Sequence, residues 1–449
     1  MPSGIPFIVA NEAAERFSFY GMRTILVVFM TKYLVDAAGQ PAGMTDAAAN
    51  SVFHLFVGAV YFFPIFGALL ADWVLGKYRV IMALSVVYCA GHFVLALMDL
   101  PGIGIAPRQL LYVGLGLIAV GAGGIKPCVS AHVGDQFGSR NAHLLERVFG
   151  WFYFSINLGA VVSTALTPVL LADERFGPAY AFGLPGVLML IATIAFWLGR
   201  HRYAHIPPSG DRVAAEWRAG GGAAVLRLLP LFAFIIAFWM LFDQTGSAWV
   251  LQADRMDQQI GQRVVLPSQM QLVNPALVLM LIPLFSYVVY PQVGRVVTLT
   301  PLRKIGAGLV LAGGSFFVSG AIERMIAASP DAPPHILWQT VPYFLLTSAE
   351  LLVSVTSLEF VYSQAPRSMK SILMGVYFLS ITAANFLVSG LNAWIDGVRK
   401  GGRDDFLTGA SYYDLFGLVA VASGIGFAVW ATTYRSRTVL QDDASPAEA

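Results

Sequence analysis

Four charged side chains lie close together near the start of the chain, in the segment NEAAERFSFYGMR, residues 11–23. On a helix, residues three or four positions apart share one face. Here that face consists of Glu12, Glu15, Arg16, Phe19, Tyr20 and Arg23. Carboxylates beside arginine form sites whose proton affinity changes with conformation, which proton coupling requires. The stripe is therefore a candidate site of proton exchange.

The chain around this stripe has the composition of a polytopic membrane protein. It has 449 residues, 57% hydrophobic and 12% charged, about half the ~25% charged residues of a soluble domain. A spanning helix needs about 20 mostly apolar residues. Twelve stretches qualify, and we expect an all-α membrane protein with twelve transmembrane helices. They are residues 7–35, 47–75, 78–99, 108–132, 146–171, 178–199, 224–250, 268–290, 301–326, 335–363, 369–396 and 410–434.

Charges inside a membrane normally face the protein interior or a water-filled cavity. Lys126 lies within the fourth stretch and is followed by Pro127. A lysine at this depth needs a carboxylate partner, a carboxylate substrate or a lowered pKa. His54 and Tyr61 share one face of the second stretch. A lone histidine can serve packing alone, although its charge can change near neutral pH.

Polar residues recur in the later stretches. They are Asn157, Trp239, Asp243, Asn274, Glu350 and Glu359. The two glutamates are nine residues apart, so they point to opposite sides of one helix and at most one faces a central cavity squarely. Asn157 and Asn274 can alternatively join helices by hydrogen bonds.

The charges of the two halves of the chain differ in sign. The first half supplies Arg16, Arg23 and Lys126, whereas the second supplies Asp243 and Glu350. A cavity with these two walls would suit a zwitterion. The aromatic residues expected to line it are Tyr20, Tyr61, Trp239 and Tyr377.

A polar connector at residues 200–223 divides the chain into two six-helix halves, 1–199 and 224–435. Such a layout is typical of two-bundle secondary transporters. With both termini in the cytoplasm, sixteen Lys and Arg residues lie in cytoplasmic loops and eight in opposite loops. This bias favours that orientation. Residues 436–449 are acidic and Ser/Pro-rich, so we expect a disordered cytoplasmic tail.

Other function classes receive little support. The net charge of +2 gives no basis for nucleic-acid binding. Cys89 and Cys128 have neither metal-ligand nor disulfide spacing. Neither HExxH nor GxSxG is present, so we expect no enzyme, metal or cofactor.

The segment GALLADWVLGKYR, residues 67–79, resembles the loop motif between helices two and three of the major facilitator superfamily. Asp72 stands at a helix end between Gly67 and Gly76, which allow close helix approach. We include Asp72 among the gate candidates. A capped, solvated turn is the alternative.

Five stretches together resemble the proton-dependent oligopeptide transporter family of this superfamily. They are EAAERFSFYGMR (12–23), GGIKPCVSA (123–131), FSINLG (154–159), FWMLFDQ (238–244) and SLEFVYSQAP (357–366). They span nearly the whole chain in the family's order. The resemblance implies a major facilitator fold of two six-helix bundles and proton-coupled import of di- and tripeptides by alternating access.

The resemblance also implies roles for individual residues. Glu12, Glu15 and Arg16 would couple protons, with Lys126 as their ion-pair partner and His54 influencing protonation. Arg16 and Lys126 would hold the peptide carboxylate, while Glu350, Asn157 and Asn274 would hold its amino terminus. Tyr20, Tyr61 and Trp239 would line the pocket. Arg23 and Asp243 would form a gate.

Two substitutions bear on substrate preference. Phe19 stands where many members have tyrosine, and Tyr377 stands where many have tryptophan.

From the resemblance as a whole we expect a monomeric peptide–proton symporter of the inner or plasma membrane. The alternative is a proton-coupled carrier of another small anion, such as nitrate, or of an amino-acid-like solute.

Overall fold

The computed structural model describes residues 1–100, 104–138, 141–208, 222–364, 370–403 and 405–434. Within these ranges eleven helices are long and apolar enough to cross a membrane. A further helix, α1 (Ile5–Val28), carries the charged stripe and is continued by a π-turn, Phe29–Tyr33. The predicted all-α architecture is confirmed.

The chain divides into two compact units. The first comprises Met1–Gly210, Thr245–Leu272 and Asn385–Phe406. The second comprises Asp211–Gln244, Val273–Ala384 and Leu407–Ala449. Neither unit is a single stretch, so these units differ from the predicted division into residues 1–199 and 224–435.

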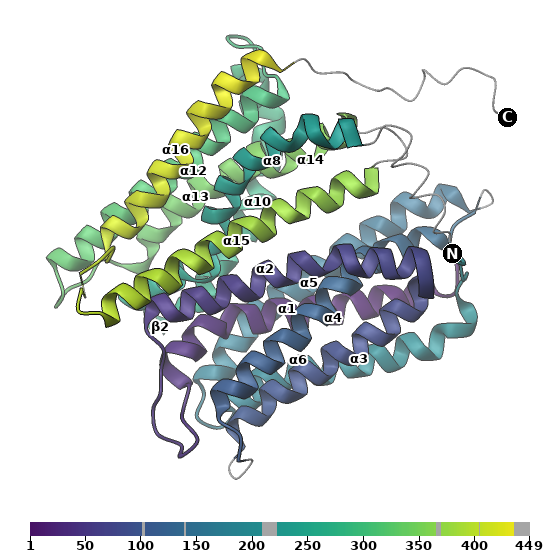
Figure 1. The fold of residues 1–449 in the computed structure, drawn as a ribbon, viewed down its shortest axis with the longest axis horizontal. Coiled ribbons are helices and arrows are strands. Elements are labelled where there is room, and N and C mark those ends of the chain that lie inside the picture. The colour runs from purple at the N-terminus through teal and green to yellow at the C-terminus, as the bar shows by residue number, and fades with distance from the viewer. Residues whose placement is uncertain (101–103, 139–140, 209–221, 365–369, 404, 435–449) are drawn as a thin grey trace. The chain divides into compact units, whose positions relative to one another are not determined.

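Six long helices form most of the first unit (Figure 1). They are α1, α2 (Asp46–Leu70), α3 (Lys77–Ala96), α4 (Pro107–Asp135), α5 (Leu145–Ala172) and α6 (Gly177–Leu198). α1 packs on α5 and α6, while α4 packs on α2 and α3. All six helices lie within residues 1–199, the half that the sequence predicts as one bundle.

Glycines allow the close contact between α2 and α4. A Cβ atom on Gly67 would lie 2.5 Å from the Cα of Gly124. A Cβ atom on Gly123 would lie 2.7 Å from the carbonyl oxygen of Val60. These separations are too short for a side chain, so the two helices can approach this closely only because Gly67 and Gly123 lack one. This approach brings Lys126 on α4 near α2.

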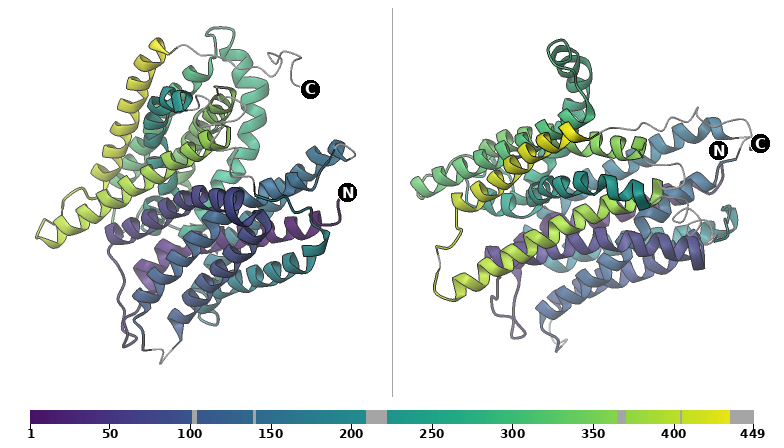
Figure 2. Two further views of the ribbon diagram at one scale, coloured as in Figure 1. Left: turned by 45° about the vertical axis from the view of Figure 1, so that its right-hand side comes forward. Right: turned by 45° about the horizontal axis from the view of Figure 1, so that its top comes forward.

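Segments from the second half of the sequence complete the first unit. They are α9 (Ala248–Asp254), the short antiparallel pair β1 (Gln259–Ile260) and β2 (Arg263–Val264), a 3-10 segment (Pro267–Leu272), and the last part of α15 (Lys370–Lys400). The 385–400 part of α15 runs alongside α2 in Figures 1 and 2.

Polar contacts tie these added segments to the first six helices. The ammonium of Lys32 lies 2.5 Å from a carboxylate oxygen of Asp254. The Thr45 hydroxyl donates to Asp396 at 2.6 Å. These contacts explain why residues from the second half group with the first.

The second unit contains the remaining helices. They are α8 (Gly222–Phe242), α10 (Val273–Leu284), α11 (Tyr290–Val293), α12 (Pro301–Ala328), α13 (Thr340–Glu350), α14 (Thr356–Gln364), the first part of α15, and α16 (Ala410–Thr433). α12 packs along α16 and α13.

Two predicted spans of the second unit are interrupted by π-turns, Phe285–Val289 and Leu351–Val355. Pro283 lies just before the first π-turn, and proline removes a backbone donor from a helix. The second turn begins directly after Glu350. Insertions of this kind are frequent at functional sites.

Much of the predicted connector, residues 209–221, and the whole predicted tail, residues 436–449, lie outside the described residues. The described start of the connector folds back onto the first unit. Burial raises the pKa of the Tyr203 hydroxyl, which donates to the Phe196 carbonyl at 2.9 Å. The connector is therefore anchored to α6 where it begins.

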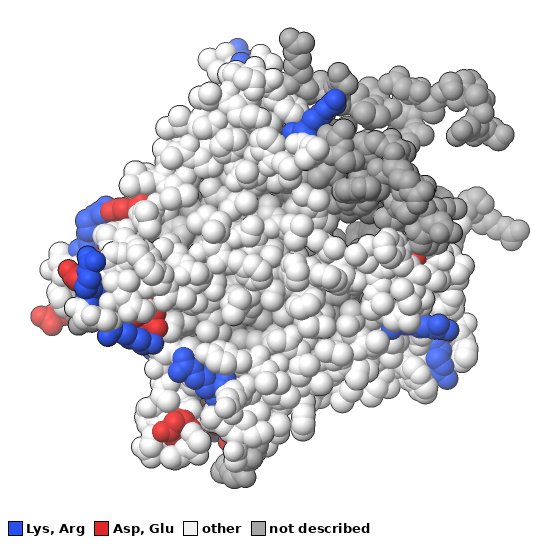
Figure 3. All heavy atoms as spheres, in the orientation of Figure 1, with Lys and Arg blue, Asp and Glu red and all other residues white. Residues whose placement is uncertain are grey.

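The surface agrees with a membrane protein. On the face drawn in Figure 3, charged side chains lie toward the ends of the helices, and the described surface between them is uncharged. Large apolar side chains such as Tyr153, Leu279 and Val429 are exposed. In water such a surface would be unstable, whereas lipid accommodates it.

Candidate functional site

The charged stripe of α1 forms a compact ionic group inside the first unit. The Nε atom of Arg16 lies 2.7 Å from Oε1 of Glu12, one helical turn away, and 3.3 Å from Oε2 of Glu15. Glu12 and Glu15 are buried, at 1% and 0% exposed. One arginine therefore stands between two carboxylates.

The two glutamates are not held equally. Glu12 accepts a hydrogen bond from Arg16. Neither oxygen of Glu15 has a hydrogen-bond partner, and the amide of Asn11, one turn earlier, likewise has none. A buried carboxylate without hydrogen bonds is costly when charged. Glu15 is thus the carboxylate of this pair with fewer stabilising contacts.

Lys126 lies against aromatic rings. Its ammonium is 4.1 Å from the centroid of Phe19 and 4.9 Å from that of Tyr61. Within the described residues it forms no ion pair. Arg16 instead forms ion pairs with both carboxylates, so the pairing of Lys126 with them stays a prediction.

The aromatic residues around Lys126 pack on one another. Phe19 contacts Tyr20 edge to face at 5.5 Å and lies 6.2 Å from Phe56. A lysine over a ring face gains about 0.5–2 kcal/mol. This stabilises the ammonium only in part, and its charge stays available to a carboxylate.

His54 is fully buried and joins three segments of the first unit. Its Nδ1 lies 2.7 Å from Oδ1 of Asn385 on α15, and its Nε2 lies 2.9 Å from the hydroxyl of Ser247. Both ring nitrogens are thus engaged by neutral groups. His54 is a connecting residue in this conformation.

The three gate candidates lie in different places. The guanidinium of Arg23 stands over the ring of Phe53 at 5.4 Å. Asp243 is buried at the end of α8 and belongs to the second unit. The predicted Arg23–Asp243 gate has one member in each unit and stays a prediction. Asp72 is exposed in the π-turn Ala71–Leu75, while its neighbour Lys77 pairs with Asp135 at 2.7 Å.

The second unit holds a simpler polar centre. The amide of Asn274 on α10 donates to Oε2 of Glu350 at 2.8 Å and to the hydroxyl of Thr347 at 3.1 Å. Within the described residues Glu350 forms no ion pair. This carboxylate, next to the π-turn of α13, is therefore positioned by neutral groups.

Aromatic side chains accompany this centre. The rings of Trp239 and Tyr377 lie 6.3 Å apart and nearly perpendicular. The Ser357 hydroxyl lies 3.4 Å from that of Tyr377. Glu359 is exposed on α14. Of the two glutamates, Glu350 is the one that lies with the predicted pocket residues.

Asn157 and Glu350 belong to different units. Asn157 belongs to the first unit, where its amide donates to the carbonyl of Tyr153, one turn earlier in α5. Its substrate-binding role stays a prediction.

Several neighbours of the predicted residues are absent from the sequence-based prediction. They are Asn11, Ser247, Thr347 and Asn385. Asn11 and Thr347 share a helix face with Glu15 and Glu350, which is a usable signal. Ser247 and Asn385 have no such spacing to His54. No group of three or more His, Cys, Asp or Glu that could hold a metal occurs in the described part of the chain.

Comparisons with known proteins identify the family and the fold. The sequence model of the POT family matches residues 78–219 and 222–401. A crystal structure of the POT family transporter PepTSo is 37% identical, covers 96% of this chain and 98% of its own, and has a TM-score of 0.84. The predicted major facilitator fold is confirmed.

Curated relatives include two animal proteins. "Peptide transporter family 1" of Drosophila melanogaster is 39% identical over 74% of this chain and 49% of its own length. "Solute carrier family 15 member 2" of Homo sapiens is 39% identical over 74% of this chain and 50% of its own. The chain spans about half the length of these relatives.

Proposed function

This chain belongs to the POT family of membrane transporters, and we propose that it imports di- and tripeptides together with protons by alternating access. The alternative substrates are another small anion or an amino-acid-like solute. The proposal includes a monomer in the inner or plasma membrane with both termini in the cytoplasm. That orientation places the more basic loops inside.

One observation carries the proposal: each unit has a charged side chain within a membrane-spanning helix that forms no ion pair with a described residue. In the described residues these are the ammonium of Lys126 and the carboxyl group of Glu350. Unpaired charges at membrane depth are costly and mark binding or transport sites. A peptide with free termini supplies a carboxylate for Lys126 and an ammonium for Glu350.

Proton coupling is assigned to Glu12, Glu15 and Arg16. Because Arg16 contacts both glutamates, a proton on Glu15 would leave the arginine paired with Glu12 alone. The released positive field would then favour a peptide carboxylate at Arg16 and Lys126. The membrane potential adds about 2.3 kcal/mol per charge per 100 mV to the driving force.

The side-chain pockets are assigned to aromatic residues. In the first unit Tyr61 contacts Lys126 and Tyr20 contacts Phe19. In the second, Trp239 and Tyr377 lie together. These aromatic surfaces would accept peptide side chains of different kinds because they make few specific polar contacts, as a carrier of many peptides requires.

The test is uptake of labelled di-alanine into proteoliposomes with an inward proton gradient. We expect accumulation above the external concentration that a protonophore abolishes. Unlabelled competitors then define the substrate. Di-alanine should compete well, whereas N-acetyl-di-alanine, di-alanine amide and nitrate should compete poorly. If nitrate or single amino acids compete better than di-alanine, the alternative is correct.

A further inference from the structure

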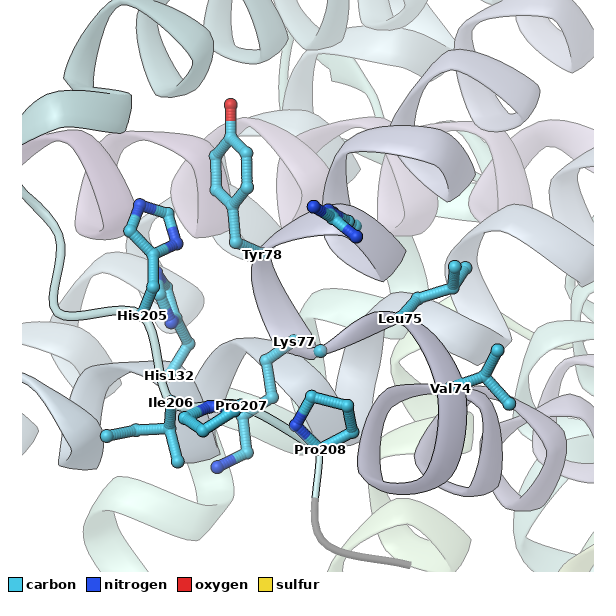
Figure 4. A pocket seen from close by; sticks show the side chains of 11 residues that line it. Val74, Leu75, Lys77, Tyr78, His132, His205, Ile206, Pro207 and Pro208 are labelled. Atoms are coloured by element: carbon cyan, nitrogen blue, oxygen red, sulfur yellow. The ribbon is translucent and has the colours of Figure 1, made fainter.

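A cavity of about 550 Å³ lies at one end of the first unit, next to the π-turn that carries Asp72, and none of the residues assigned to transport lines it. It is bounded by the start of α3, by His132 on α4 and by residues 205–208, which follow α6 (Figure 4). None of its lining residues is acidic, whereas Lys77, Arg79, His132 and His205 all line it.

The start of α3 contributes backbone donors to this cavity. Gly76 is the N-cap residue and provides no side-chain cap. The first backbone hydrogen bond of the helix runs from Val80 to Gly76, so the N–H groups of residues 77–79 lack a partner within the helix. Such a helix end attracts anions. No acidic side chain occupies the first turn of α3.

His132 supplies an independent sign of a ligand. It is 1% exposed, and its Nε2 atom has no hydrogen-bond partner. Its ring packs against Tyr203 at 5.1 Å and against Phe196 at 5.9 Å. A buried ring nitrogen without a partner is costly unless something in the cavity completes its bonding.

The opposite wall is held in a fixed position. The side-chain amide of Gln136 accepts from the Ala204 N–H at 2.9 Å and donates to the Ala204 carbonyl at 3.4 Å. The ring of His205 meets that of Tyr78 edge to face at 5.0 Å. The chain segment that forms this wall is therefore held in place by contacts with α4 and α3.

The cationic side chains differ in how far they are neutralised. Lys77 is bonded to both oxygens of Asp135, at 2.7 and 3.0 Å. Arg79 is exposed and forms no ion pair with any residue that the structure describes. Its planar guanidinium can bind two oxygens of one phosphate.

We propose that this cavity binds a phosphate group, held by Arg79, the free N–H groups at the start of α3 and Nε2 of His132. The proposal does not depend on which solute the protein transports. A phosphate group here has two sources, an anionic phospholipid headgroup or a soluble phosphate. Basic pockets at the cytoplasmic side of membrane helices suit the headgroup.

The test is calorimetric titration of the purified, delipidated full chain with three probes at matched ionic strength. Short-chain phosphatidylglycerol carries phosphate and acyl chains, short-chain diacylglycerol carries acyl chains alone, and inorganic phosphate carries neither chain. Saturable binding of phosphatidylglycerol but not of inorganic phosphate identifies a lipid site. Saturable binding of both identifies a site for phosphate itself.

Variants locate the site. Arg79→Gln should weaken phosphatidylglycerol binding roughly tenfold, the effect of one charge-assisted hydrogen bond. His132→Phe keeps a ring against Tyr203 and Phe196 and should weaken binding roughly fivefold. The matched control is Arg108→Gln, an exposed arginine at the other end of α4, which should bind as the wild type does.

Two results would overturn the proposal. One is equal binding of phosphatidylglycerol and diacylglycerol, which would mean that only acyl chains are recognised. The other is an Arg79→Gln variant with wild-type affinity. Because Arg79 is exposed, its substitution should leave the fold intact, and the test stands even if His132→Phe is unstable.

Discussion

The polar centres of the two units differ in how their charges are balanced. In the first unit Glu12 and Glu15 share Arg16, and Lys126 lies against two rings. In the second, Glu350 is held by the neutral amide of Asn274. A shared arginine can change partners when one carboxylate is protonated, whereas a carboxylate bound by an amide has no second ion to exchange. We therefore propose that the first centre couples protons and that the second recognises the peptide ammonium.

The largest effect is expected for Lys126→Ala, which removes the unpaired cation of the first centre. Loss of a hydrogen bond to a charged group costs about 1.5–3 kcal/mol, so the apparent affinity for di-alanine should fall roughly 10- to 100-fold. Proton-driven uptake should fall with it. Uptake kinetics in proteoliposomes measure both.

Lys304 provides the matched control for Lys126. Its ammonium stands 4.1 Å from the ring centroid of Tyr290, the same distance as that of Lys126 from the ring of Phe19. Lys304→Ala should transport as the wild type does. Equal losses in the two variants would mean that removing any ring-bound lysine is harmful, and the binding role of Lys126 would be refuted.

The next effect concerns the second centre. Glu350→Gln keeps the shape of the side chain but removes its charge. We expect roughly tenfold weaker binding of di-alanine and no loss for N-acetyl-di-alanine, which has no ammonium. Competition assays measure both affinities. The control is Glu359→Gln, because Glu359 is exposed on α14. If Glu350→Gln weakened the binding of di-alanine and of N-acetyl-di-alanine equally, the assignment of Glu350 to the peptide ammonium would be contradicted.

A smaller effect is expected for Asn274→Ala. This change leaves the Glu350 charge in place and removes one donor, which is worth about 0.5–1.5 kcal/mol. Di-alanine affinity should therefore fall about 2- to 10-fold. Asn157→Ala is the comparison, since the amide of Asn157 is bonded within its own helix. A larger loss for Asn157 than for Asn274 would reverse their ranking as binding residues.

The smallest effect is expected for Phe19→Leu, which removes one ring from beneath Lys126. A cation–π contact is worth about 0.5–2 kcal/mol, and Tyr61 still contacts the ammonium. We expect a few-fold change in di-alanine affinity, measured by competition. Phe19→Tyr keeps the ring and should restore wild-type affinity. If Phe19→Tyr lowers the di-alanine affinity more than Phe19→Leu does, the contact of Lys126 with the ring face does not determine that affinity.

The sequence was sufficient to predict elements whose signal is local. The twelve apolar stretches and the shared face of Glu12, Glu15 and Arg16 follow from hydropathy and helical spacing. Both predictions agree with the helices and the ion pairs of the structure.

Contacts between distant segments could not be predicted in this way. His54 meets Asn385 from 331 positions away, and no periodicity links them. The pairing of Lys126 with the carboxylates stays a prediction, since in this structure Arg16, on the same helix as Glu12 and Glu15, contacts both of them. The π-turn after Glu350 was also missed, since it depends on how α13 packs and not on its hydropathy.

The most direct test of these two roles, proton coupling by Glu15 and substrate binding by Glu350, compares the variants Glu15→Gln and Glu350→Gln. Proton-driven uptake and counterflow exchange of di-alanine are measured for both under the same vesicle conditions. Exchange reports binding and movement of the carrier, while driven uptake also requires coupling. We predict that Glu15→Gln loses driven uptake and keeps exchange, whereas Glu350→Gln loses both in proportion. Unchanged driven uptake in Glu15→Gln, or selective loss of driven uptake in Glu350→Gln, would contradict the account.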